Sequence, residues 1–176
     1  MDKKKVSELE EVKESPFNNP LCKIRFYPVW GESKSDGKPW YQLLFELKRD
    51  SARVEYSVRV QSDQLLSLAL LGVRFQHYRN GDFKVDYAGI DATKVLGLDM
   101  PLRVSAVPAI GQNKRGQWFH RLDFTLARGD LKFEIGVVVF KTSLLALEYY
   151  GFQFQPLPAQ AELAAFDRLS YGGDDE

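Results

Sequence analysis

The sequence has few of the residues that most often build metal and redox sites. Among its 176 residues it holds one cysteine, Cys22, and two histidines, His77 and His120. A single cysteine excludes a disulfide within the chain, and zinc sites need clusters of cysteine and histidine that this sequence does not contain. We therefore expect no metal, no cofactor and a reducing compartment.

The signatures of nucleotide-dependent and hydrolytic enzymes are also absent. The sequence contains no GxxxxGK[ST] loop, no GxGxxG turn after a strand and no GxSxG elbow. Asp86 and Asp91 lie close together in the sequence, but such carboxylate pairs are common on protein surfaces. These absences favour a protein that is not an enzyme.

Long apolar runs are missing as well. A helix that spans a bilayer needs about 20 consecutive apolar residues, and the apolar runs here are much shorter. The first five residues, Met-Asp-Lys-Lys-Lys, precede no apolar stretch, which is unlike a signal peptide. We therefore expect no contact with a membrane and an intracellular location.

The formal net charge is zero, but the charges are unevenly distributed. Residues 1–15 carry a net charge of −1, residues 157–176 carry −4, and residues 16–156 carry +5. A basic body with an acidic tail is typical of polyanion-binding proteins whose tail competes for the basic surface, although a short acidic tail also serves solubility alone. We divide the chain into a flexible arm at 1–20, one domain at 21–156, and an acidic tail at 157–176 that is a candidate contact for a protein partner.

The chain contains an internal repeat. When it is shifted by 79 residues, positions 43–76 align with positions 122–155 without a gap, and 13 of the 34 aligned positions are identical. The preceding segments correspond at a shift of 80. A repeat of this length indicates one supersecondary unit used twice. We place the first repeat at 22–78, a linker at 79–100 and the second repeat at 101–155.

Each repeat unit is predicted to be strands followed by a short helix. Alternating polar and apolar residues at 23–27, 40–49 and 53–60 indicate strands, and leucines at helical spacing over 65–71, ended by Gly72, indicate a helix. The second copy predicts strands at 102–110, 118–128 and 131–140 and a helix at 142–150, ended by Gly151. The expected fold is α+β, with two antiparallel sheets packed with two short helices as a pseudo-symmetric pair.

One face of the predicted strands combines aromatic and cationic side chains. It lies opposite the core residues Leu43, Phe45 and Leu47, because successive side chains of a strand point to opposite faces. The aligned pairs Trp40/Phe119, Lys23/Arg103 and Arg53/Lys132 keep this character in both copies, and the turns add further cations. The predicted binding residues are Lys23, Arg25, Tyr27, Lys34, Lys38, Trp40, Lys48, Arg53, Arg59, Arg103, Lys114, Arg115, Phe119, Arg121 and Lys132.

Aromatic and cationic residues together are what a single-stranded nucleic acid needs. Bases stack on aromatic rings for roughly 1–3 kcal/mol each, and cations follow the phosphates, so that binding tolerates many sequences and weakens with salt. The same residues also occur on ordinary solvated strands. The alternative is a protein-interaction or scaffold module, whose apolar interface would respond little to salt.

The second unit resembles a known family. The segment Leu102–Pro108, a glycine-containing turn, Trp118–Phe124, Phe133–Val137 and Ser143–Leu147 together resemble the C-terminal half of Whirly proteins. Their superfamily includes single-stranded-DNA-binding transcriptional coactivators and guide-RNA-binding proteins. The resemblance implies two strand-then-helix repeats, assembly into homo-dimers or tetramers, and binding of single strands along the sheets. It favours DNA over RNA, in replication, recombination, repair or transcription.

Overall fold

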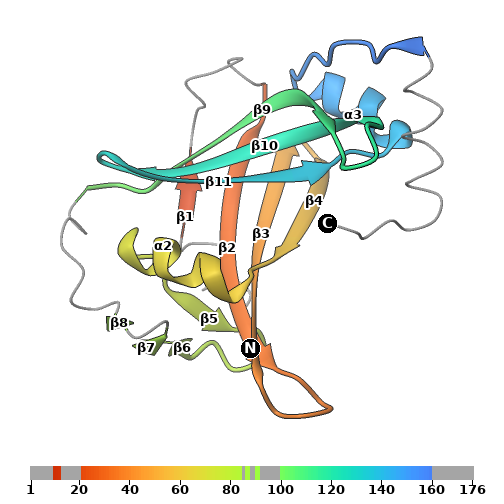
Figure 1. Cartoon of the computed structure of the whole chain (residues 1–176). Coiled ribbons are helices and arrows are strands. Elements are labelled where there is room, and N and C mark those ends of the chain that lie inside the picture. Colours follow the sequence, from red (N-terminus) through yellow and green to blue (C-terminus); the bar gives the residue numbers. More distant parts are fainter. Residues whose placement is uncertain (1–9, 13–20, 85, 88–89, 92–99, 160–176) are drawn as a thin grey trace.

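The computed structural model describes residues 10–12, 21–84, 86–87, 90–91 and 100–159. Their strands form two main sheets and a small ribbon, the ribbon consisting of β7 (Asp86–Tyr87) and β8 (Ile90–Asp91) (Figure 1). Sheet 1 has the order β4 (Ala52–Arg59), β3 (Pro39–Arg49), β2 (Lys23–Glu32), β5 (Phe75–His77) and β6 (Phe83–Lys84), and β1 (Glu10–Val12) also pairs with β2. Sheet 2 has the order β11 (Leu131–Val138), β10 (Trp118–Arg128) and β9 (Arg103–Gln112).

One short helix follows the third long strand of each sheet, after β4 in sheet 1 and after β11 in sheet 2. The two helices are α2 (Leu65–Leu70) and α3 (Leu144–Tyr149), and each is entered through a 3-10 turn. Each helix ends at a glycine with positive φ, 79° at Gly72 and 98° at Gly151, a conformation that other residues adopt at a cost. The fold is therefore α+β, as the alternation of strand and helix patterns predicted.

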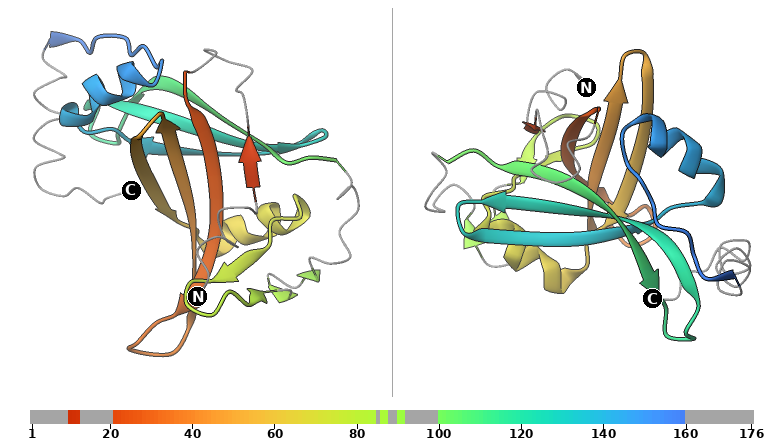
Figure 2. Two further views of the ribbon diagram at one scale, coloured as in Figure 1. Left: turned by 180° about the vertical axis from the view of Figure 1, so that it is seen from behind. Right: turned by 90° about the horizontal axis from the view of Figure 1, so that it is seen from above.

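The core lies between the two sheets, whose strands cross in Figure 2. At its centre the rings of Phe45 and Phe124 stack with centroids 4.0 Å apart and planes 11° apart. Both rings are fully buried, and so are Leu43 and Leu47 of β3 beside them. The prediction that Leu43, Phe45 and Leu47 share the buried face is confirmed.

The two sheets have matching strand boundaries. Strands β3 and β10, strands β4 and β11, and helices α2 and α3 are all related by the 79-residue shift of the sequence alignment, and β2 and β9 by a shift of 80. A backbone hydrogen bond in the segment between the third strand and the helix is also found at equivalent positions in the two halves. The Val60 amide donates to the Tyr41 carbonyl and the Val139 amide to the His120 carbonyl, both at 2.9 Å. Phe45 and Phe124, which stack on each other, are equivalent positions in this alignment.

Two equivalent arginines join the halves of the molecule reciprocally. Arg49, at the end of β3, donates to the carbonyl of Tyr149 at the end of α3, and its guanidinium lies 4.3 Å from that ring's centroid. Arg128, at the end of β10, donates through Nε to the carbonyl of Leu71 at the end of α2, at 2.8 Å. Each arginine thus stabilises the C-terminus of the other half's helix, where carbonyls lack partners and positive charge is favoured.

The halves differ at their edges. After α2 the chain forms β5, which pairs with β2 in parallel, whereas the corresponding described residues after α3 form no strand. Residues Glu10–Val12, which lie in the predicted flexible arm, pair with β2 as β1. The other residues of that arm, and residues 160–176 of the predicted acidic tail, lie outside the described part of the chain.

Candidate nucleic-acid interface

The outer face of sheet 1 consists of the side chains on β2, β3 and β4 that point away from the core. At one end of this face the strand register places Lys23 opposite Lys48 and Lys48 opposite Arg53. All three residues are exposed. Like charges directly opposite each other destabilise a sheet, a cost that the carboxylate of Glu46 in the next row offsets at Arg53.

The next row toward the middle of the face contains Arg25, Glu46 and Glu55. Glu46 is only 4% exposed and accepts a hydrogen bond from the Tyr27 hydroxyl at 3.1 Å. It also lies 3.1 Å from Nη1 of Arg53. The Glu46 carboxylate therefore has two partners within the sheet, whereas the Glu55 side chain is exposed to solvent.

Tyr27, one of the predicted binding residues, is covered by its neighbours on this face. The residue is only 7% exposed and forms a small apolar cluster with Val29, Trp40 and Leu44 on the outer face. Burial raises the pKa of its hydroxyl, which remains a neutral donor toward Glu46. Strand alternation predicted the right face for Tyr27 but not the neighbours that cover it.

An aromatic cluster occupies the opposite end of the same face. Trp40 lies directly over Gly31, where an added Cβ would come within 2.4 Å of the indole ring and 2.7 Å of Tyr78. The Trp40 and Tyr78 ring centroids are 5.4 Å apart. The Arg59 guanidinium lies 5.5 Å from the Trp40 ring and that of Arg79 lies 5.2 Å from the Tyr78 ring, both within cation–π range.

Tyr78 and Arg79 were not among the residues that the sequence predicted. They reach this face because β5 pairs with β2 in parallel, and the Tyr78 amide donates to the Trp30 carbonyl at 3.0 Å. His77 shapes the following turn, since its Nδ1 accepts the amide of Arg79 at 3.2 Å and its Nε2 lies 2.9 Å from a Glu32 carboxylate oxygen. The dipeptide Asn80-Gly81 is typical of a tight turn, but such a turn does not indicate which strand β5 pairs with.

The outer face of sheet 2 repeats this plan with weaker components. Phe119 lies over Gly111 as Trp40 lies over Gly31, with an added Cβ coming within 2.7 Å of the ring. Arg121 makes two bonds to the Asp123 carboxylate, at 2.5 and 2.9 Å, so its predicted cationic role is partly used within the sheet. The basic row is reduced to Arg103 and Lys132, with Ala127 between them.

The predicted turn cations lie beyond the aromatic end of each sheet. Lys34 and Lys38 are exposed in the turn between β2 and β3, a hairpin that projects from the molecule in Figures 1 and 2. Lys114 and Arg115 are exposed in the turn between β9 and β10. There the Asn113 side-chain oxygen accepts the Arg115 amide at 2.9 Å and holds the turn in place.

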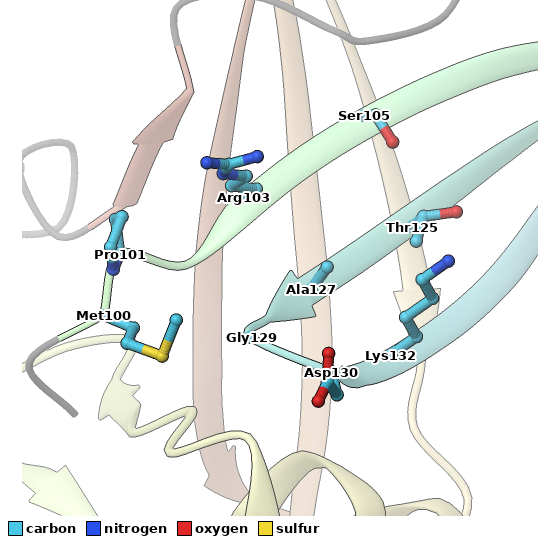
Figure 3. Close-up of a pocket in the computed structure, with 9 residues that line it drawn as sticks. All are labelled: Met100, Pro101, Arg103, Ser105, Thr125, Ala127, Gly129, Asp130 and Lys132. Atoms are coloured by element: carbon cyan, nitrogen blue, oxygen red, sulfur yellow. The ribbon is translucent and has the colours of Figure 1, made fainter. Parts of the chain in front are cut away.

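A hollow of about 410 Å³ lies on the outer face of sheet 2, at its basic row (Figure 3). The hollow lies at this row because the small side chain of Ala127, between the longer side chains of Arg103 and Lys132, leaves space there. It brings two predicted residues, Arg103 and Lys132, to one site. The lining residues are Met100, Pro101, Arg103, Ser105, Thr125, Ala127, Gly129, Asp130 and Lys132.

Among the described residues, no three His, Cys, Asp or Glu side chains gather where they could hold a metal ion. Asp86 and Asp91 are register partners in the ribbon of β7 and β8. Burial raises the pKa of the Cys22 thiol to about 11, which keeps it protonated. No helix in this part of the chain is long and apolar enough to cross a membrane.

Comparison with known proteins finds no matching family model, no matching curated protein and no matching solved structure.

Proposed function

We propose that this protein binds single-stranded nucleic acid along the outer face of sheet 1 and does so without catalysis. One observation carries the proposal: the basic row and the aromatic cluster occupy opposite ends of one sheet face. The row Lys23, Lys48 and Arg53 supplies phosphate contacts, and the rings of Trp40 and Tyr78 supply stacking.

The dimensions of the face suit a short stretch of single strand. From Lys23 to Gly31 the face extends over nine residues of β2, and the eight steps between them span about 27 Å at the usual rise per residue. This length accommodates several nucleotides, in line with the site sizes of other sheet-based single-strand binders. The turn cations Lys34 and Lys38 would continue the phosphate path beyond the aromatic cluster. Contacts of this kind read no base edges, so binding should be largely independent of sequence.

The finer expectations from the sequence remain part of this proposal. The matching strand boundaries and reciprocal arginines support two copies of one unit in a Whirly-like arrangement. DNA is the preferred ligand, in replication, recombination, repair or transcription within the cell. Residues 157–176 would supply the acidic tail that competes for the basic face or recruits a protein partner.

A protein-contact role is a second candidate that one observation favours. Leu66 and Leu70 on α2 are exposed, and so are the equivalent Leu145 and Tyr149 on α3, with Leu145 the most exposed at 77%. Each pair is spaced i, i+4 and so forms one apolar strip on its helix. A second copy of the chain is the occupant that this duplicated strip favours, which would make the protein a homo-dimer or tetramer.

The test is the fluorescence anisotropy of a labelled 30-nucleotide single strand, titrated with the full chain at low and high salt beside a matched duplex. Binding that favours the single strand and weakens steeply with salt supports the nucleic-acid role. Absence of binding at low salt would overturn it. Light scattering on the same samples tests the helix strips, because Leu66→Ser with Leu145→Ser should reduce the mass of an oligomer.

A further inference from the structure

The hollow on sheet 2 is closed at one end. It lies where β10 turns into β11, and Met100 on one wall meets Gly129 on the other: the Met100 sulfur lies 3.3 Å from where a Cβ on Gly129 would be. Figure 3 shows Pro101 on the side of Met100 and Asp130 beside Gly129. A strand lying along this sheet face would therefore meet a wall here.

The side chains of the hollow suit a compact anion. Arg103 and Lys132 are exposed cations on the two strands that flank Ala127. The hydroxyl-bearing residues Ser105 and Thr125, which are register partners, lie in the adjacent row. Guanidinium, ammonium and hydroxyl groups are the donors that bind phosphate most strongly.

At the equivalent place on sheet 1 a lysine stands where sheet 2 has Ala127. Lys48 is the counterpart of Ala127, and it completes a continuous row with Lys23 and Arg53. A continuous row of cations suits a chain of phosphates that passes across the strands. Two cations separated by a gap suit one phosphate that enters between them.

We propose that this hollow binds the terminal phosphate monoester of a single-stranded nucleic acid, which rests on the nucleic-acid function proposed above. A terminal monoester carries close to two negative charges at pH 7, whereas a phosphate within the strand carries one. The paired cations match the higher charge. Asp130 is the one acid among the lining residues, and Glu134 is the register partner of Thr125 in the adjacent row.

The test compares four labelled eight-nucleotide strands of one sequence: hydroxyl at both ends, phosphate at the 5′ end, phosphate at the 3′ end, and phosphate at both. We expect one or both monophosphorylated strands to bind the full chain roughly tenfold more tightly than the hydroxyl strand, the gain of a charge-assisted contact. The 5′ and 3′ strands show which end enters. The preference should shrink between pH 7.5 and 5.5, because the monoester gains a proton with a pKa near 6.

Substitutions test whether the preference for a terminal phosphate arises in the hollow. Arg103→Gln and Ala127→Met, the second of which fills the gap with an uncharged side chain, should each remove the preference and leave binding of the hydroxyl strand within about twofold. Lys48→Gln is the matched control on sheet 1, and it should weaken all four strands by one factor. Thermal melting of each variant confirms that it is folded, and Lys132→Gln replaces any variant that is not.

Three results would overturn the proposal. Equal affinity for phosphorylated and hydroxyl strands would remove the strand-end site and leave the function of sheet 1 intact. A preference that survives Arg103→Gln, Lys132→Gln and Ala127→Met would place the end-binding site elsewhere. Failure of every strand to bind at low salt would remove the nucleic-acid function and the strand-end site together.

Discussion

The outer faces of the two sheets share a plan but differ in charge and in shape. On β2, β3 and β4 the face of sheet 1 carries five cations and two carboxylates, whereas on β9, β10 and β11 the face of sheet 2 carries three cations and two carboxylates. Each face has an aromatic ring over a glycine at one end and cations at the other. Charge is thus the feature that separates the two faces most clearly.

The difference arises from a few substitutions at equivalent positions. Lys48 is replaced by Ala127, which lines the hollow, and Arg59, the cation beside Trp40, is replaced by Val138. Leu44 is replaced by Asp123, which holds Arg121. One sheet architecture therefore presents an unbroken row of three cations on sheet 1 and two cations separated by a gap on sheet 2.

The largest expected effect comes from removing the basic row of sheet 1. Lys23→Gln, Lys48→Gln and Arg53→Gln combined should weaken binding of a 30-nucleotide single strand by roughly a hundredfold or more at low salt, since three phosphate contacts disappear. The dependence of log affinity on log salt should become less steep by about 2. Anisotropy titrations at several salt concentrations measure both quantities.

The matched variant on sheet 2 is Arg103→Gln with Lys132→Gln. If the comparison of the two faces is correct, this pair changes the affinity for the long strand by only a few-fold. If the sheet 1 variant and the sheet 2 variant lose equal affinity, both faces bind long strands alike. If only the sheet 2 variant loses affinity, the long strand binds to sheet 2 and not to sheet 1.

A smaller effect is expected from the aromatic rings. Trp40→Ala removes a stacking surface worth roughly 1–3 kcal/mol, which corresponds to about 5- to 150-fold in affinity. Phe119→Ala should cost less than this, because a phenyl ring offers a base a smaller stacking surface than an indole does. Trp40→Phe reproduces the residue of sheet 2 and should fall between wild type and Trp40→Ala. Equal effects of Trp40→Ala and Phe119→Ala would contradict a main site on sheet 1.

Much of this comparison could be predicted from the sequence, because side chains alternate strictly along a strand. The alternation identified the buried residues Leu43, Phe45 and Leu47, and hence the outward direction of Lys48 and Trp40. The 79-residue shift similarly predicted the order of strands and helices in both halves. These predictions depend only on local periodicity, which the sequence displays directly.

The rest depended on contacts between distant segments. Tyr78 and Arg79 join the aromatic cluster because β5 pairs with β2 in parallel. The second repeat has no equivalent strand among its described residues from which this pairing could have been inferred. The burial of Tyr27 depends on the side chains of neighbouring strands, and the hollow depends on Met100 meeting Gly129 across the end of sheet 2. No short-range pattern encodes such meetings.

The reciprocal arginines offer a test in which stability changes and binding does not. Arg49→Ala and Arg128→Ala each remove a charged donor from the end of a helix, and each should lower the free energy of unfolding by about 1–3 kcal/mol. Affinity for the hydroxyl-ended strand should stay unchanged, because neither group belongs to an outer face. Urea unfolding and anisotropy on the same preparations measure the two quantities. A large loss of affinity in a folded variant would place these arginines in the binding surface.

The smallest effect is expected from releasing a cation on sheet 2. In Asp123→Asn the Arg121 side chain loses the carboxylate that now holds it, and binding of a long single strand should tighten by about twofold, in line with the modest worth of a partly exposed ion pair. Arg121→Gln with Asp123→Asn is the control, since removal of both charges should return the affinity to the wild-type value. Glu55→Gln is the counterpart on sheet 1, where the exposed carboxylate lies between the basic row and the aromatic cluster. If Glu55→Gln tightens binding more than Asp123→Asn does, the nucleic acid lies over sheet 1. If Asp123→Asn has the larger effect, the nucleic acid lies over sheet 2 although that face carries fewer cations.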